Sequence, residues 1–136
     1  MADQDNQIWQ QHLGQCRVLG ENKMVERHGK CIGIKLFQWG NHLWELWFCP
    51  AGEVIKEHVH QHCDIRMKIL GGRMQGRIGH NSGPVGWNDF GRVFDIPAGV
   101  VHNAVILDPF CMFLSMEKWD SREPTSAAED FVTNEC

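Results

Sequence analysis

The chain has 136 residues, which is enough for one compact domain with a buried core and too short for two ordinary domains. Its 13 basic and 17 acidic residues give a net charge of −4 without any basic block, which argues against nucleic acid as a partner. The polar N-terminus lacks a signal sequence, and no apolar run approaches the ~18 residues that a membrane span needs. We therefore expect a cytoplasmic protein with no membrane partner.

Short apolar runs separated by turns dominate the chain from residue 31 onward. Before them, NQIWQQHL at 6–13 is the one stretch that predicts a helix, short and amphipathic. The apolar runs are CIGIKLFQW at 31–39, HLWELWFC at 42–49, IRMKIL at 65–70, RVFDI at 92–96, VVHNAVIL at 100–107 and FCMFLSMEKW at 110–119. Gly, Pro and Asn lie between them, as in LGG at 70–72 and PAG at 97–99. This pattern predicts an all-β sandwich or barrel.

Two stretches lack the apolar pattern. GHNSGPVGWNDFG at 79–91 has the composition of a loop, and the sequence after Trp119 turns polar and acidic. We therefore expect three parts: an N-terminal segment with the first strand or strands over 1–30, a barrel over 31–119, and a flexible acidic tail over 120–136.

The six cysteines are scattered without a C-x-x-C pair, so they resemble neither a zinc module nor a redox motif. We interpret most of them as small buried hydrophobes in a reducing compartment, and we leave Cys63 open because it lies among histidines. Six tryptophans and no tyrosine form the other unusual feature. Core packing accounts for most of them, and an aromatic surface between strands is the alternative, suited to a second subunit.

Residues 52–64, GEVIKEHVHQHCD, place three histidines and an aspartate on even numbers. Alternate side chains of a strand share a face, so His58, His60, His62 and Asp64 would converge there as four potential metal ligands. The alternative is a polar, solvated strand edge.

A second stretch, GRVFDIPAGVVHNAVI at 91–106, adds His102 just after a Pro-x-Gly turn. Together the two stretches resemble the two motifs of the cupin family. The first motif, G-x5-H-x-H-x3/4-E-x6-G, is matched by Gly52, His58, His60, Asp64 and Gly71, with Asp in place of Glu. The second motif, G-x5-P-x-G-x2-H-x3-N, is matched by Gly91, Pro97, Gly99 and His102, with Ile106 in place of Asn.

The resemblance implies a small double-sheet β-barrel of the cupin or jelly-roll type. It also implies one divalent transition metal per chain, held in the barrel mouth by His58, His60, His102 and a carboxylate. Neutral imidazoles with one carboxylate suit Fe(II), which we favour, as well as Mn, Ni, Co or Zn. The resemblance further implies a homodimer.

The fourth ligand and the substrate anchor stay open at this stage. Asp64 is one methylene shorter than glutamate, so His62 or a water is the substitute if Asp64 does not reach the metal. If strand parity persists beyond Asp64, Arg66 points into the cavity and binds an anionic substrate. A bulge would reverse the parity and place Arg66 in solvent.

Two classes of function fit these residues. The first is a metal-dependent enzyme acting on a small molecule, with a non-haem Fe(II) dioxygenase and an anionic organic substrate favoured over isomerase, decarboxylase or lyase chemistry. The absence of tyrosine argues against lyases that use a tyrosine base. The second class is a non-catalytic cupin module that binds a metal or small ligand. The fold alone does not choose between them.

Overall fold

The computed structural model describes residues 16–18, 25–86, 93–120 and 123–133, and every regular element within these ranges is a strand. The strands are β1 (Cys16–Val18), β2 (Val25–His28), β3 (Cys31–Trp39), β4 (His42–Pro50), β5 (Val54–His58), β6 (Cys63–Ile78), β7 (Asn81–Gly86), β8 (Phe94–Ile96) and β9 (His102–Trp119). The all-β prediction is confirmed. The helix expected over 6–13 lies outside the described residues.

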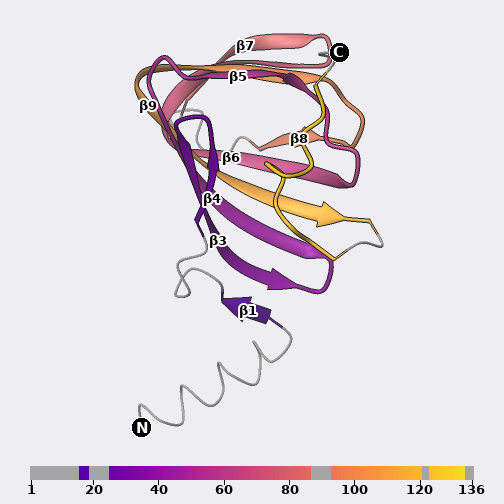
Figure 1. The fold of residues 1–136 in the computed structure, drawn as a ribbon. Helices are drawn as coiled ribbons and strands as arrows, with labels where there is room; N and C mark the ends of the chain where they lie inside the picture. Colours follow the sequence, from indigo (N-terminus) through magenta and orange to yellow (C-terminus); the bar gives the residue numbers. More distant parts are fainter. Residues whose placement is uncertain (1–15, 19–24, 87–92, 121–122, 134–136) are drawn as a thin grey trace, which may run out of the picture.

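The strands pair in antiparallel fashion and form two layers, as Figure 1 shows. One layer contains β3, β4, the second half of β9, the first half of β6, and β8. The other contains β5, the first half of β9, the second half of β6, and β7. Because β6 and β9 pass through both layers, the two sheets close into the double-sheet barrel that the sequence predicts.

A glycine bulge lets β6 pass from one layer to the other. The register with β9 shifts between Ile69 and Gly71 and again between Gly72 and Met74. Gly72 has φ +71°, and a Cβ atom there would overlap the carbonyl oxygen of Phe110, so only glycine fits. The turn that the sequence predicts at 70–72 is thus a bulge within one long strand.

The interior is filled by alternate residues of the strands, as the period of two requires. The buried apolar side chains are Cys31, Leu43, Trp47, Cys49, Cys63, Ile65, Ile69, Met74, Ile96, Ala104, Ile106, Cys111, Phe113, Trp119 and Ala127. Trp47 and Trp119 therefore have the core role expected for most tryptophans, whereas Trp39 is exposed.

Two expectations about irregular segments need correction. Part of the predicted loop at 79–91 is strand β7, which pairs with the end of β6. The expected loose tail is wrong over 123–133, because this segment lies against the barrel and Val132 pairs with Val59 through two backbone hydrogen bonds of 2.9 and 3.0 Å. We call residues 123–133 the C-terminal segment. It crosses one end of the barrel in Figure 1.

Candidate metal centre

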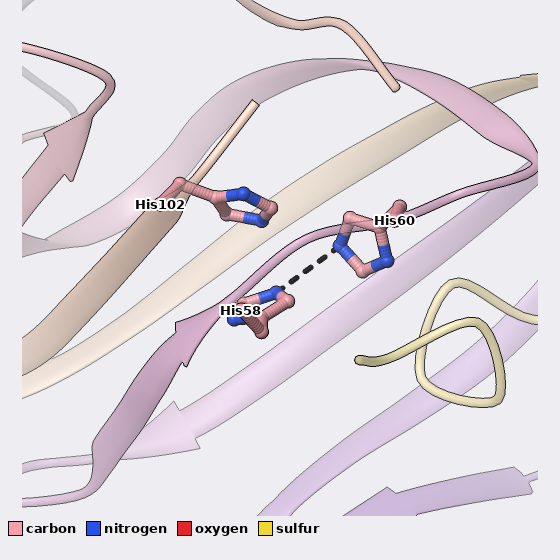
Figure 2. Close-up of side chains that lie close together, drawn as sticks. All are labelled: His58, His60 and His102. Atoms are coloured by element: carbon pink, nitrogen blue, oxygen red, sulfur yellow. Dashed lines mark hydrogen bonds between the residues drawn. The ribbon is translucent and has the colours of Figure 1, made fainter. Parts of the chain in front are cut away.

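Three histidines meet at the end of the barrel that the C-terminal segment crosses, two of them at the ends of the neighbouring strands β5 and β9 and the third just after β5. His58 ends β5 and pairs in register with His102, which begins β9. His60 follows two residues later, where its carbonyl oxygen accepts a hydrogen bond from the backbone N–H of Gly99. Figure 2 shows the three rings around a common space.

The ring nitrogens of these histidines are close enough to share one ion. One nitrogen from each ring lies within 4.8 Å of the others, and Nε2 of His58 is 3.1 Å from Nε2 of His60. All three side chains are buried, with exposed fractions of 5 to 7%. The sequence prediction that His58, His60 and His102 converge agrees with this geometry.

The opposite nitrogen of each ring faces a backbone carbonyl. Nδ1 of His58 lies 2.6 Å from the carbonyl oxygen of Lys56, Nδ1 of His102 lies 3.0 Å from that of Val100, and Nδ1 of His60 contacts that of Asp130. A carbonyl oxygen only accepts hydrogen bonds, so each Nδ1 carries a hydrogen and donates it. Each Nε2 is then left with its lone pair directed into the common space.

Burial keeps these rings neutral. It lowers the pKa of His58 to about 3 and that of His60 to about 4, and it lowers the pKa of His102 as well. Electrostatic repulsion from the imidazole of His102 is the second-largest contribution to the values of His58 and His60. Near neutral pH the three rings are therefore unprotonated and able to bind a metal.

The donor set fits a divalent transition metal. Two imidazole nitrogens bound at about 2.1 Å to one ion and at right angles lie about 3.0 Å apart, which matches the 3.1 Å between His58 and His60. The contact between the two Nε2 atoms, dashed in Figure 2, has the length of a hydrogen bond, but the carbonyls behind the rings require the hydrogen on each Nδ1. Two lone pairs therefore face each other, and a cation between them would convert their repulsion into attraction. The carbonyls behind the rings hold them in this orientation, as the outer partners of metal-binding histidines do.

The structure does not place Asp64 or His62 with the three histidines. Asp64 is exposed, and its carboxylate accepts a hydrogen bond of 2.8 Å from the backbone N–H of Ala98. His62 pairs with Asp120 at 2.8 Å. The physical reason is a bend between His60 and Cys63, which shifts the strand parity so that odd-numbered residues point inward from Cys63 onward.

The same shift removes Arg66 from the cavity, so the predicted substrate anchor is wrong. Its side chain is 61% exposed and binds Asp95 through two hydrogen bonds, of 2.8 and 3.3 Å. Ile65, Met67 and Ile69 line the cavity in its place.

Asp130 is a residue of the site that the sequence analysis missed. It is buried, and its carboxylate accepts hydrogen bonds from the backbone N–H groups of Gln61 and His62, at 3.1 and 2.7 Å. The Cys63 thiol lies 3.7 Å from the same carboxylate. His60, Cys63 and Asp130 form a second group of potential ligands that shares His60 with the first. Asp130 thus holds the bend that carries the histidines.

The histidines open into a cavity of about 830 Å³ inside the barrel. Phe131 of the C-terminal segment stacks on His58, with ring centroids 3.8 Å apart, and also contacts His28 at 4.3 Å. Among the described residues that line the cavity, the one with a formal charge is Asp95, which is paired with Arg66. Most of the wall is apolar, so the cavity suits an uncharged or largely apolar molecule.

A pair of buried glutamates lies behind the cavity wall. Glu45 and Glu117 are 0 and 1% exposed and hydrogen-bond to each other. Ser115, which lines the cavity, donates a hydrogen bond of 3.0 Å to Glu117. Ser126 and the backbone N–H of Ala127 donate to Glu45 at 2.9 and 3.2 Å. Burial raises the pKa of both carboxyls, and the charge of Glu45 raises that of Glu117 further, so the pair retains a proton.

Comparison with known proteins identifies the fold. A scan against protein-family models gave no match, and a search of curated proteins gave none either. Among solved structures, KdgF from a Halomonas species is similar with a TM-score of 0.64 at 13% identity, over 76% of this chain and 92% of that one. An RmlC-like cupin from Shewanella frigidimarina has a TM-score of 0.64 at 16% identity, over 79 and 96% of the two chains. The Cnp3 cupin domain of Schizosaccharomyces pombe reaches 0.60 at 15% identity, over 74 and 72%.

The chain therefore has the cupin fold, as the two sequence motifs indicate. Its histidine cluster makes it a cupin domain with a candidate metal site. Within the described residues, no helix is long and apolar enough to cross a membrane.

Proposed function

We propose that His58, His60 and His102 bind one divalent transition metal and that the protein is a metal-dependent enzyme, with a non-haem Fe(II) dioxygenase as the favoured form. The observation that carries this proposal is the common orientation of the three rings. Each Nδ1 is held by a carbonyl, and the Nε2 atoms are left to converge beside a cavity. When bound, such an ion supplies a Lewis acid and, in the case of iron, a centre for dioxygen chemistry.

The composition of the cavity wall supports a small, uncharged or largely apolar organic substrate. The anionic substrate expected from the sequence depended on Arg66, which pairs with Asp95 at the surface. Met67 and Ile69 take that place in the wall and offer apolar contact instead. Ser115 donates its hydrogen to Glu117, which leaves the lone pairs of its oxygen free to accept from a substrate hydroxyl or amide.

The C-terminal segment supports the same site from outside. Asp130 fixes the bend after His60 with its carboxylate and orients the His60 ring with its carbonyl. Phe131 covers His58 and keeps water from that side of the ring. These contacts favour a preorganised site in which few polar groups need to rearrange when a ligand binds.

Metal analysis of protein purified without added metal tests the binding step. We expect one divalent ion per chain, and we expect His60→Ala and His102→Ala to lower the affinity by at least ~10-fold while the barrel stays folded. His62→Ala is the matched control, because this neighbouring histidine pairs with Asp120 and lies outside the cluster. A full metal content in the His60→Ala, His102→Ala double variant would refute the site.

Turnover separates the enzyme from its alternatives. We expect the iron-loaded protein to consume oxygen with an uncharged member of a panel of diketones, thiols and small carboxylates. Product formation without oxygen uptake would favour isomerase, decarboxylase or lyase chemistry. Saturable binding of a panel member without turnover would favour a non-catalytic binding module.

A further inference from the structure

Three cysteines form a row across the inner face of the layer that contains β3, β4 and β9. Cys49 pairs in register with Cys111, and Cys31 lies opposite Cys49 on the other side because Ile32 pairs with Phe48. The three thiols are free, are 2% exposed or less, and belong to one core cluster. The fold thus brings together residues that are 18 and 62 positions apart in the sequence.

Two observations set Cys31 and Cys49 apart within this row. Both side chains line the cavity that the histidines share, whereas the described lining residues do not include Cys111. The thiols of Cys31 and Cys49 also hydrogen-bond to each other. They therefore form a close dithiol in the cavity wall, in which Cys31 is the slightly exposed member at 2% and Cys49 is fully buried.

We propose that Cys31 and Cys49 are an oxidation site in the cavity wall, at which hydrogen peroxide or a small organic hydroperoxide produces an intramolecular disulfide. The site uses residues other than the candidate metal ligands, so it does not depend on the proposed metal or on turnover. It gives the cavity a second kind of chemistry, a reversible two-electron oxidation of the protein itself.

The strand geometry permits this bond. Residues directly opposite each other on antiparallel strands have Cα atoms about 4.5 or 5.5 Å apart, depending on their place in the hydrogen-bond pattern. Both distances fall within the roughly 4.4–6.8 Å range of protein disulfides. Cys31 and Cys49 also point to the same face, so rotation of the two side chains brings the sulfur atoms together without separation of the strands.

The local electrostatics assign different roles to the two thiols. The hydrogen bond from Cys49 lowers the pKa of the Cys31 thiol, while that bond and burial raise the pKa of Cys49. Cys31 is therefore the thiolate that attacks the peroxide oxygen. The O–O bond breaks, the leaving oxygen takes a proton and departs as water or an alcohol, and Cys31 becomes a sulfenic acid. The Cys49 sulfur then attacks the Cys31 sulfur, the S–S bond forms as the S–O bond breaks, and the sulfenic oxygen leaves as water with the proton of the Cys49 thiol.

Peptide mapping of the native full-length chain tests the proposal directly. Trypsin places each of the six cysteines in its own peptide, namely 1–17, 31–35, 36–56, 57–66, 93–118 and 123–136. The protein is treated with hydrogen peroxide and then unfolded in urea that contains iodoacetamide, which alkylates the remaining thiols. It is digested without reductant. We expect peptides 31–35 and 36–56 to be joined, with the loss of two alkylatable thiols per chain and full recovery on reduction.

The controls separate this pair from its neighbours. Cys111→Ser should leave the bond intact, whereas Cys49→Ser should abolish it. Cys63 is an internal control, because burial raises the pKa of its thiol and keeps it protonated. The proposal fails if peptide 36–56 is joined to 93–118, if peptides 31–35 and 36–56 are recovered alkylated, or if oxidation in urea yields the same single pair without the fold.

Discussion

The buried pair of Glu45 and Glu117 makes the stability of the protein depend on pH in a way that one substitution removes. Two carboxylates in hydrogen-bond contact and out of water do not both ionise, so the native pair keeps a proton. Glu117 is the member whose pKa is raised by the charge of its partner, so the proton resides there. Glu117→Gln replaces this neutral acid by a neutral amide of the same shape.

The magnitude follows from proton linkage. Above the unfolded pKa of about 4.3, the unfolded chain releases a proton that the native pair retains, so native stability falls as pH rises towards the folded pKa. For each retained proton, the unfolding free energy of the native protein falls by about 1.4 kcal/mol per unit rise in pH. Between pH 5.5 and 7.5, the variant should therefore gain up to about 2.7 kcal/mol in unfolding free energy relative to the native protein.

Urea unfolding of the two proteins at pH 5.5, 6.5 and 7.5 measures this difference. Histidine and cysteine ionisation contributes equally to both proteins and cancels in the comparison. Glu129→Gln makes the same change on an exposed side chain and controls for the loss of one carboxylate. A constant difference between the native protein and Glu117→Gln across this pH range would refute the shared proton.

Three further predictions concern the site and the barrel. In the metal-free Glu117→Gln variant, in which the opposing effect of the glutamate pair is removed, the unfolding free energy should fall by about 3 kcal/mol between pH 7.5 and 5.5, because His58 and His60, with pKa values lowered to about 3 and 4, stay neutral in the fold while the unfolded chain binds protons below about pH 6.5. Urea midpoints of this variant that do not change with pH would contradict this. Asp130→Ala should lower the unfolding free energy by about 2–3 kcal/mol and weaken metal binding roughly 10-fold, since two backbone N–H groups lose their acceptor. Glu129→Ala is the control, and equal metal affinities of the two variants in titrations would count against the role of Asp130. Gly72→Ala should lower the melting temperature far more than Gly40→Ala, which has a similar φ of +58° but no atom near the new Cβ; similar thermal shifts would contradict the bulge geometry.

The resemblance to the two cupin motifs was enough to predict that His58, His60 and His102 converge, whereas strand parity alone placed His62 with them as well. His58 and His60 are two residues apart on an extended chain, and His102 follows a turn signal that places it at the start of the next inner strand. The same parity rule failed at Asp64 and Arg66, because a bend after His60 changes the parity by one residue. That bend is stabilised by Asp130, which accepts a hydrogen bond from the backbone N–H of Gln61, 69 residues away. No local sequence pattern predicts such a contact.

The glutamate pair could have been predicted from the sequence. In HLWELWFC and FCMFLSMEKW, alternation places Glu45 beside Leu43 and Trp47, and Glu117 beside Trp119, on the inner face. Two acids at core positions are an informative departure from the apolar pattern. The homodimer, the cytoplasmic location and iron as the metal stay predictions.

The order of synthesis gives the C-terminal segment a further consequence. The chain leaves the ribosome from its N-terminus, so β5 and His102 emerge before the segment that carries Asp130 and Phe131. Contacts that join residues about 70 positions apart, such as His60 with Asp130, form only after this last segment has emerged. The histidine site is thus completed only once residues 123–133 are available to fold, because a chain synthesised as far as His102 still lacks the carbonyl and the carboxylate of Asp130 that hold His60 and the bend after it.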